Sequence, residues 1–368
     1  MNQNRLLWVD WIKFLAIFGI IGIHVTSSLL SPDILFSSKW YQGVLAASSF
    51  RFGVILFIMA SGYLILRRQQ SIYEIPKRFK RIVLPFIFWL LVYAILKVFV
   101  LKGLGPNWNF GDLINFIVGG LLDPTIVSVQ FWFVYMILGL YILSPILSRW
   151  IQNAPIKEIE YALCVWVIVS LLQFANVDSI LIDYLRYFTG AIGYFVLGYY
   201  LTIKNIAICK NRCLGLILFL IGTAITFFGT VLFSYMGSTQ SLFFIRLGDI
   251  TPGACLQGIG LFIILFNTNF DNLNENINNI VIRLSKASYG IYLCNILVIN
   301  VLEKLHLINL NGFTLLNIVI YAILVLILSA LCIFIMSKVP ILKIFSSIND
   351  SNDDGLKVFL AKLIGNRI

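Results

Sequence analysis

Charged residues are scarce in this sequence: Asp, Glu, Lys and Arg together make up 12% of its 368 residues, whereas 60% of them are hydrophobic. A soluble protein carries about a quarter charged residues, so this chain cannot cover a water-facing surface. Its mean hydropathy of +0.94 excludes a disordered chain as well. We therefore expect one polytopic membrane domain rather than two or three soluble domains.

Several signatures of known binding and catalytic sites are also missing. The six cysteines mostly lie singly within apolar runs, which is not a disulfide framework. The CxxxC formed by Cys209 and Cys213 has no neighbouring His cluster or second Cys pair that would complete a metal site. The sequence contains no glycine-rich phosphate loop, Walker motif or dinucleotide fingerprint. We therefore expect neither a metal cofactor nor nucleotide hydrolysis.

Long apolar stretches dominate the chain instead. A membrane-spanning helix needs about 20 such residues. Ten segments approach this length, namely residues 11–30, 44–66, 82–101, 131–148, 159–175, 185–203, 213–235, 250–267, 284–302 and 313–336. The eighth is the weakest, because proline and glycine interrupt it. The pattern predicts an all-α bundle of about ten spans, with a short re-entrant or interfacial helix at residues 113–122.

The positions of Lys and Arg predict how the chain is oriented. With the N-terminus in the cytoplasm, 19 of the 27 cations fall inside and 4 outside, and the remaining four lie within the spans. This distribution follows the positive-inside rule, so the net charge of +11 needs no nucleic acid or other anionic partner. We expect both termini in the cytoplasm, a transmembrane domain over residues 1–340, and a basic, polar cytoplasmic tail over residues 341–368.

Two ionisable residues share one face of the first segment. Lys13 and His24 are eleven positions apart, which on an α-helix is about 20° from three full turns and about 16.5 Å along the axis. An intramembrane ionisable group is a functional candidate, and histidine is the side chain best suited to moving protons near neutral pH. The alternatives are a snorkelling Lys13, paired with Asp10, and a neutral His24 buried at a helix contact.

Two further basic positions point to chemistry. Arg51 begins the second segment at about the depth of His24, and it is either an interfacial arginine or a permanent cation that stabilises an oxyanion. Arg78 and Arg81 begin the third segment on its cytoplasmic side. Topology alone explains that basic cluster, but the spacing of three residues also makes a clamp suited to phosphates.

Several strings resemble the acyltransferase type 3 family, whose members are integral-membrane enzymes that acylate sugars of the bacterial envelope. RLLWVDWIKFLAIFGIIGIHV, with Lys13 and His24, resembles the first helix of the family, and RFGVILFIMASGYL, with Arg51, resembles the second. Arg78 and Arg81 match the R-x-x-R of the family. QFWFVYMILGLYILSPIL and SKASYGIYLCNILV resemble its aromatic central segment and its late S-Y-x-x-Y-L motif. The matches extend from residue 10 to residue 295 and so cover most of the chain.

The resemblance implies an O-acyltransferase of the bacterial plasma membrane. Such an enzyme moves an acyl group, expected here to be acetyl, from cytoplasmic acyl-CoA to a hydroxyl of an extracytoplasmic or lipid-linked polysaccharide. His24 and Arg51 are then the expected catalytic residues. The other expected site residues are Lys13, Arg78 and Arg81 for acetyl-CoA or another acyl-CoA, and Trp132, Tyr135, Tyr289 and Asn295 for substrate contacts.

One position departs from the family pattern. Many members close the late motif with histidine, whereas this chain has Asn295, which can form hydrogen bonds but cannot titrate. Two other functions remain open at this point: a transporter or export-coupled flippase for envelope glycans, and an inactive structural partner in a glycan-synthesis complex. Acyl esters on the envelope polymer that disappear when the protein is deleted would favour the enzyme.

Overall fold

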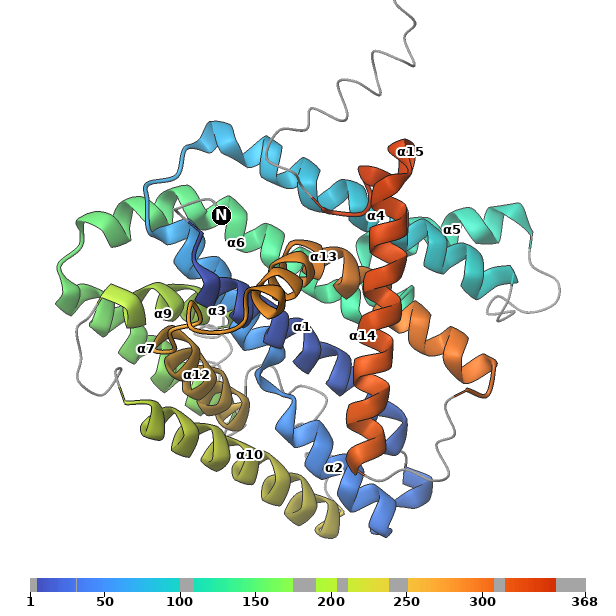
Figure 1. Ribbon diagram of the computed structural model, residues 1–368, viewed down its shortest axis with the longest axis horizontal. Helices are drawn as coiled ribbons and strands as arrows, with labels where there is room; N and C mark the ends of the chain where they lie inside the picture. The colour runs from blue at the N-terminus through green and yellow to red at the C-terminus, as the bar shows by residue number, and fades with distance from the viewer. Residues whose placement is uncertain are drawn as a thin grey trace, which may run out of the picture. The chain divides into compact units, whose positions relative to one another are not determined.

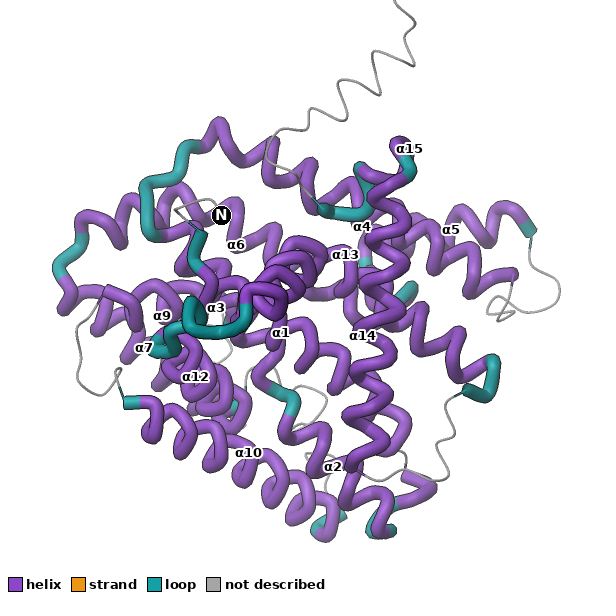
Figure 2. Tube along the Cα trace, viewed as in Figure 1, coloured by secondary structure: helices purple, strands orange, loops and turns teal. Residues whose placement is uncertain are grey.

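The computed structural model describes residues 5–30, 32–99, 109–174, 190–203, 211–237, 251–307 and 315–348. Every regular element in these ranges is a helix, as Figure 2 shows. The all-α class expected from the sequence is therefore confirmed. Of the tail expected at residues 341–368, positions 349–368 lie outside the described residues.

Long α-helices make up most of the described chain. They are α1 (Leu7–Thr26), α2 (Ser38–Ser49), α3 (Phe52–Leu66), α4 (Ile75–Phe99), α5 (Phe110–Leu122), α6 (Trp132–Asn153), α7 (Ile156–Phe174), α9 (Ala191–Ile203), α10 (Arg212–Tyr235), α12 (Pro252–Phe266), α13 (Glu275–Lys304), α14 (Leu315–Lys338) and the short α15 (Pro340–Lys343). Short 3₁₀ helices lie at Ser27–Leu30, Pro32–Ile34, Ile72–Glu74, Pro124–Ile126 and Val129–Phe131.

Seven stretches of the described chain are long and apolar enough to cross a membrane. They are Leu7–Thr26, Ser38–Leu66, Ile72–Val98, Val129–Asn153, Arg212–Tyr235, Glu275–Lys304 and Leu315–Lys338. The other three expected spans coincide with α7, which has charged residues in its first turns, and with α9 and α12, which have only 13 and 15 residues. The count of ten spans and the cytoplasmic termini stay predictions.

Side-chain caps explain where several helices begin. Asn109 and Asp112 form a capping box at the start of α5, each side chain accepting from the backbone N–H of the other residue. The expected short helix at residues 113–122 is confirmed by α5. Thr251 caps α12 by accepting from the Ala254 N–H, and Pro252 occupies the first helical position, where its missing N–H costs nothing.

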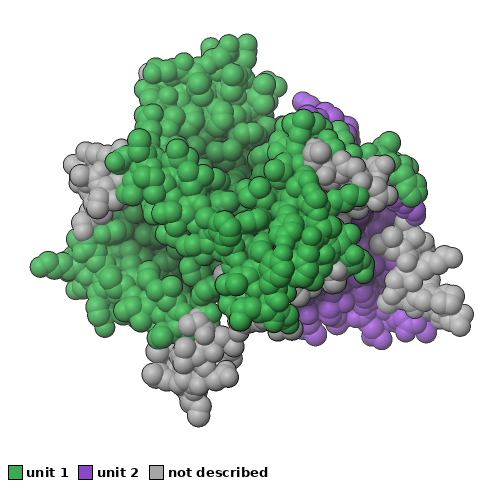
Figure 3. All heavy atoms as spheres, turned by 90° about the horizontal axis from the view of Figure 1, so that it is seen from below, with its two compact units in different colours: residues 1–70, 143–285, 305–324 green, residues 71–142, 286–304, 325–368 purple. Residues whose placement is uncertain are grey.

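The chain forms two compact units, which are coloured separately in Figure 3. Unit 1 comprises residues 1–70, 143–285 and 305–324, and unit 2 comprises residues 71–142, 286–304 and 325–368. The single transmembrane domain expected over residues 1–340 stays a prediction.

In unit 1, α1 packs on α3, and α10 runs beside α12, as Figure 1 shows. The second pair approaches closely because glycines face each other: a Cβ on Gly222 would strike the backbone of Gly253, and a Cβ on Gly260 would strike that of Gly215. The glycines that interrupt the apolar pattern of α12 thus serve helix packing, as small residues do in membrane bundles.

In unit 2, α4 is flanked by α5 and by the C-terminal part of α13. The Tyr289 hydroxyl of α13 donates to the Ile82 carbonyl of α4 at 3.0 Å. Gly290 of α13 lies against the Ile333 side chain of α14. These contacts place the late S-Y-x-x-Y-L motif between α4 and α14.

Candidate functional site

The crossing of α1 and α3 positions the first group of candidate residues. A Cβ on Gly53 would lie 2.7 Å from the Ile20 nitrogen and 2.8 Å from the Ala16 oxygen, so the two backbones nearly touch. Gly19 of α1 lies in turn against the Phe52 ring. Since glycine alone permits this approach, the start of α3 is held beside the second half of α1.

His24 and Arg51 come together at this crossing. His24 lies in the last turn of α1 and is partly buried, and Arg51, at the start of α3, is only 3% exposed. The Arg51 guanidinium is close enough for its charge to act on the His24 imidazole. The sequence predicts that His24 and Arg51 lie at about the same depth, and in unit 1 the two side chains lie close together. A proton carrier beside a permanent cation can accept a proton while the cation opposes developing negative charge.

A buried amide near Arg51 was missed by sequence reasoning. Gln257 of α12 is completely buried, and its Nε2 donates to the Ser48 carbonyl at 2.6 Å and to Thr223 Oγ1 at 2.8 Å. Ser48 lies three residues before Arg51, and among the described residues the Gln257 Oε1 has no hydrogen-bond partner. The available signal was a glutamine inside an apolar segment. Burial of its amide is unfavourable unless the amide forms hydrogen bonds.

At the other end of α1, Asp10 lies three residues before Lys13 and is held by partners on both sides. The Asp10 carboxylate accepts two hydrogen bonds from Arg5, each at 2.7 Å, and one from the Ser285 hydroxyl at 2.6 Å. Trp11 donates to Asn278 Oδ1 at 3.1 Å and so ties α1 to α13. Lys13 is partly buried. Because α1 continues unbroken from Leu7 to Thr26, Lys13 and His24 keep the separation of about 16.5 Å expected for eleven residues.

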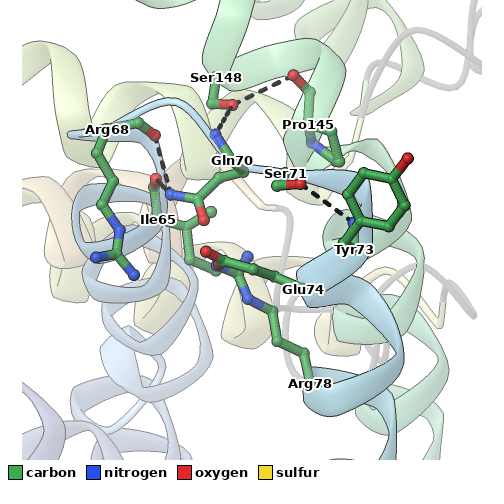
Figure 4. Close-up of polar contacts among 9 residues, drawn as sticks. All are labelled: Ile65, Arg68, Gln70, Ser71, Tyr73, Glu74, Arg78, Pro145 and Ser148. Atoms are coloured by element: carbon green, nitrogen blue, oxygen red, sulfur yellow. Dashed lines mark hydrogen bonds and ion pairs between the residues drawn. The ribbon is translucent and has the colours of Figure 1, made fainter.

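The second group of candidates belongs to unit 2. Arg78 forms an ion pair with Glu74 at 2.6 Å, one helical turn earlier, as Figure 4 shows. Arg81, on the same helix, is exposed. Both arginines act electrostatically on the Tyr141 hydroxyl, and Tyr141 acts in turn on Tyr289. Tyr141 is thus a further member of this group that sequence reasoning missed.

The remaining candidates occupy different environments in unit 2. Trp132 is partly buried and meets Phe133 edge to face, whereas Tyr135 is 39% exposed and donates to the Leu121 carbonyl at 2.6 Å. Asn295 is completely buried. Its Nδ2 donates to the Tyr292 carbonyl at 2.6 Å and, more weakly, to a second carbonyl one turn back. Asn295 therefore belongs to the packed interior, Tyr289 is partly buried, and Tyr135 is exposed.

Comparison with known families decides the classification. Residues 6–337 match the model of the acyltransferase domain family Acyl_transf_3, which leaves only the two ends of the chain unmatched. The chain belongs to the acyltransferase type 3 family. No curated protein and no solved structure matches the chain.

The family and the apolar helices together identify a membrane acyltransferase. Its two groups of family-type residues divide between the units. Lys13, His24 and Arg51 lie in unit 1, whereas the R-x-x-R, the aromatic segment around Trp132 and the late motif lie in unit 2. Among the described residues of this acyltransferase, no three His, Cys, Asp or Glu side chains are grouped so that they could hold a metal ion.

Proposed function

We propose that this acyltransferase moves an acyl group, acetyl in the simplest case, from cytoplasmic acyl-CoA to a hydroxyl of an extracytoplasmic or lipid-linked polysaccharide in the bacterial plasma membrane. The observation that carries the proposal is the juxtaposition of His24 and Arg51 at the α1–α3 crossing in a chain of this family. Acyl transfer needs a base for the hydroxyl and a cation for the oxyanion, and these two side chains supply both.

In this mechanism the acceptor hydroxyl attacks the thioester carbonyl carbon while His24 takes the hydroxyl proton. The tetrahedral oxyanion develops next to Arg51, whose charge does not depend on pH. Collapse of the intermediate breaks the carbon–sulfur bond, and the imidazolium returns its proton to the CoA thiolate. The products are the ester and CoA–SH, and His24 ends neutral. A variant of the same scheme lets the imidazole carry the acyl group briefly before the acceptor attacks.

The donor phosphates require cations. Arg78 and Arg81, one turn apart at the start of α4, supply a clamp for them, and Lys13 is a second candidate. The Glu74 carboxylate that holds Arg78 would have to yield to phosphate. A guanidinium binds phosphate through two parallel hydrogen bonds, as it does a carboxylate, so phosphate can take the place of the Glu74 side chain.

The deciding experiment measures the transfer of labelled acetyl from acetyl-CoA to envelope glycan by purified protein. His24→Ala should lower the rate about a hundredfold or more, as expected for the loss of a general base. The matched control is His306→Asn, which removes the other histidine at an exposed turn and should leave the rate unchanged. Wild-type transfer by His24→Ala would refute the assignment of His24. Glycans that carry the same acyl esters with and without the protein would refute the function itself.

A further inference from the structure

Several buried polar side chains in unit 2, Ser329 among them, remain without complete hydrogen bonding, and three of them are large. Trp89 Nε1, Gln130 Nε2 and Asn295 Oδ1 form no hydrogen bond with the described residues, although their residues are only 3%, 1% and 0% exposed. An unpaired buried polar atom is destabilising, so these three large side chains call for an explanation.

Tyr93 lies beside Trp89, Gln130 and the turn that carries Asn295. Its ring lies 6.4 Å from the Trp89 ring and 5.3 Å from that of Phe131, the neighbour of Gln130. The Gln130 amide lies against the Tyr93 hydroxyl, although its Nε2 forms no hydrogen bond of normal geometry. The same hydroxyl donates to the Leu293 carbonyl at 3.1 Å and accepts from the Leu297 N–H at 2.8 Å. Leu293 and Leu297 lie two residues before and two residues after Asn295.

Tyr292 of α13 contacts both Gln130 and Asn295. Its hydroxyl donates to the Gln130 carbonyl, and its own carbonyl accepts from Asn295 Nδ2 at 2.6 Å. The free Asn295 Oδ1 is therefore presented by the same turn that contacts Gln130. The unpaired set consists of N–H donors on Trp89 and Gln130 and one acceptor on Asn295, with no charged member. Such a set suits an uncharged ligand that offers both an acceptor and an N–H or O–H donor, such as an amide.

The position of this set along α4 identifies the kind of amide. Arg78 and Arg81 precede Trp89 on α4 by eleven and eight residues, about 16.5 and 12 Å along the axis, with Pro85 between Arg81 and Trp89. In an extended CoA at about 1.25 Å per bond, the two amides of the pantetheine arm lie about 6 and 11 Å from the pyrophosphate. The spacing of Arg81 and Trp89 along α4 is close to the distance from the pyrophosphate to the second of these amides.

We propose that Trp89, Gln130 and Asn295 bind an amide of the pantetheine arm of acyl-CoA, with Tyr93 as a positioning residue. This inference rests on the proposed function, because it takes acyl-CoA as the donor. The indole and glutamine N–H groups donate to the amide carbonyl, and Asn295 Oδ1 accepts from the amide N–H. The arrangement also gives a reason for asparagine at the position where many family members have histidine. The side-chain oxygen of asparagine is a hydrogen-bond acceptor that stays neutral at any pH.

The test compares two ligands on the purified full-length protein. CoA contains the arm, whereas 3′,5′-ADP carries phosphates without it. Trp89→Phe keeps an aromatic ring but removes the Nε1–H donor, and Asn295→Leu removes the Oδ1 acceptor. Each variant should weaken CoA binding about five- to tenfold, as the loss of one hydrogen bond implies, and leave 3′,5′-ADP binding within about twofold of wild type. The unchanged nucleotide binding also shows that the variant is folded.

Cys294→Ser is the matched control. Cys294 is the residue before Asn295, but its thiol donates to the Ser329 carbonyl of α14 and is not part of the proposed set. It should bind CoA as wild type does. Wild-type CoA affinity in both site variants would overturn the proposal, and so would equal losses for CoA and 3′,5′-ADP. A raised KM for the glycan acceptor with unchanged CoA binding would assign the set to the acceptor instead. If the wild-type protein bound neither ligand, the proposed function would fail, and this inference with it.

Discussion

The phenolic oxygen of Tyr93 in α4 accepts a hydrogen bond from the Leu297 N–H in α13 at 2.8 Å. In a regular α-helix that N–H bonds to the carbonyl four residues earlier, which is Leu293, and the Tyr93 hydroxyl donates to that same carbonyl. A side chain that bonds to both the N–H and the carbonyl of one backbone hydrogen bond in another helix holds that turn in place and can bend it. The turn that Tyr93 holds is the one that carries Asn295.

Tyr93→Phe should therefore act on both stability and donor binding. We expect a loss of about 1 kcal/mol in the free energy of unfolding, because one bridging hydroxyl is removed from a buried position. CoA affinity should also fall, while 3′,5′-ADP affinity stays constant. Thermal unfolding in detergent and ligand titration measure the two effects. Tyr41→Phe, which removes an exposed hydroxyl paired with Tyr235, is the matched control and should change neither quantity. Wild-type CoA affinity in Tyr93→Phe would contradict the positioning role.

Removing the arginine clamp should weaken the binding of every phosphate-bearing ligand. The double variant Arg78→Gln with Arg81→Gln loses two charge-assisted contacts, each worth about tenfold in affinity or more. CoA and 3′,5′-ADP should be affected alike, in contrast to the variants of Trp89 and Asn295. Isothermal titration of both ligands measures the effect.

The control for this experiment comes from the same helix. Lys77→Gln with Lys80→Gln makes the same change in net charge at two exposed neighbouring positions. If this pair weakened binding as strongly as the arginine pair, the effect would come from general charge and the clamp would be disproved.

The α1–α3 crossing should be intolerant of even one methyl group. Gly53→Ala places a Cβ within 2.8 Å of backbone atoms of Ile20 and Ala16, and backbone cannot move aside cheaply. We expect a destabilisation of about 1 to 3 kcal/mol and a loss of acyl transfer, because the shift separates His24 from Arg51. Gly139→Ala in α6 meets nothing within 4 Å and should be neutral or stabilise by about 0.5 to 1 kcal/mol. A fully active and stable Gly53→Ala would show that the crossing is looser than described.

The packing of α13 on α14 can be checked by cross-linking. The thiols of Cys294 and Cys332 lie within hydrogen-bonding reach of each other, and the Cys294 thiol donates to the Ser329 carbonyl at 3.7 Å. Mild oxidation should join the two cysteines into one disulfide, which peptide mass mapping detects as the loss of two hydrogens. Cys332→Ser should abolish the cross-link, whereas Cys164→Ser, which alters an exposed cysteine of α7, should not. Oxidised protein without this peptide pair would contradict the described packing.

Much of the helical organisation was predictable from apolar pattern and end signals. The stretch around His24, the segment beginning at Arg51 and the short helix after Asn109 all occur where the sequence places them. The least certain span, at α12, proved to be short and rich in glycine because it packs closely on α10. A hydropathy pattern records how apolar a residue is, but not which neighbouring helix needs it to be small.

The sequence alone determined the membrane class, the family, and the basic and histidine positions that acyl transfer needs, because composition and motif spacing are local properties. Tertiary structure alone decided that Arg51 meets His24, that Tyr141 joins the arginine pair, and that Tyr93 lies beside Trp89, Gln130 and the turn that carries Asn295. Apart from Trp89 and Tyr93, which are neighbours on α4, those partners are tens to hundreds of residues apart. Their proximity depends on how helices cross, and crossing is decided by side-chain packing between helices rather than by any pattern within one of them.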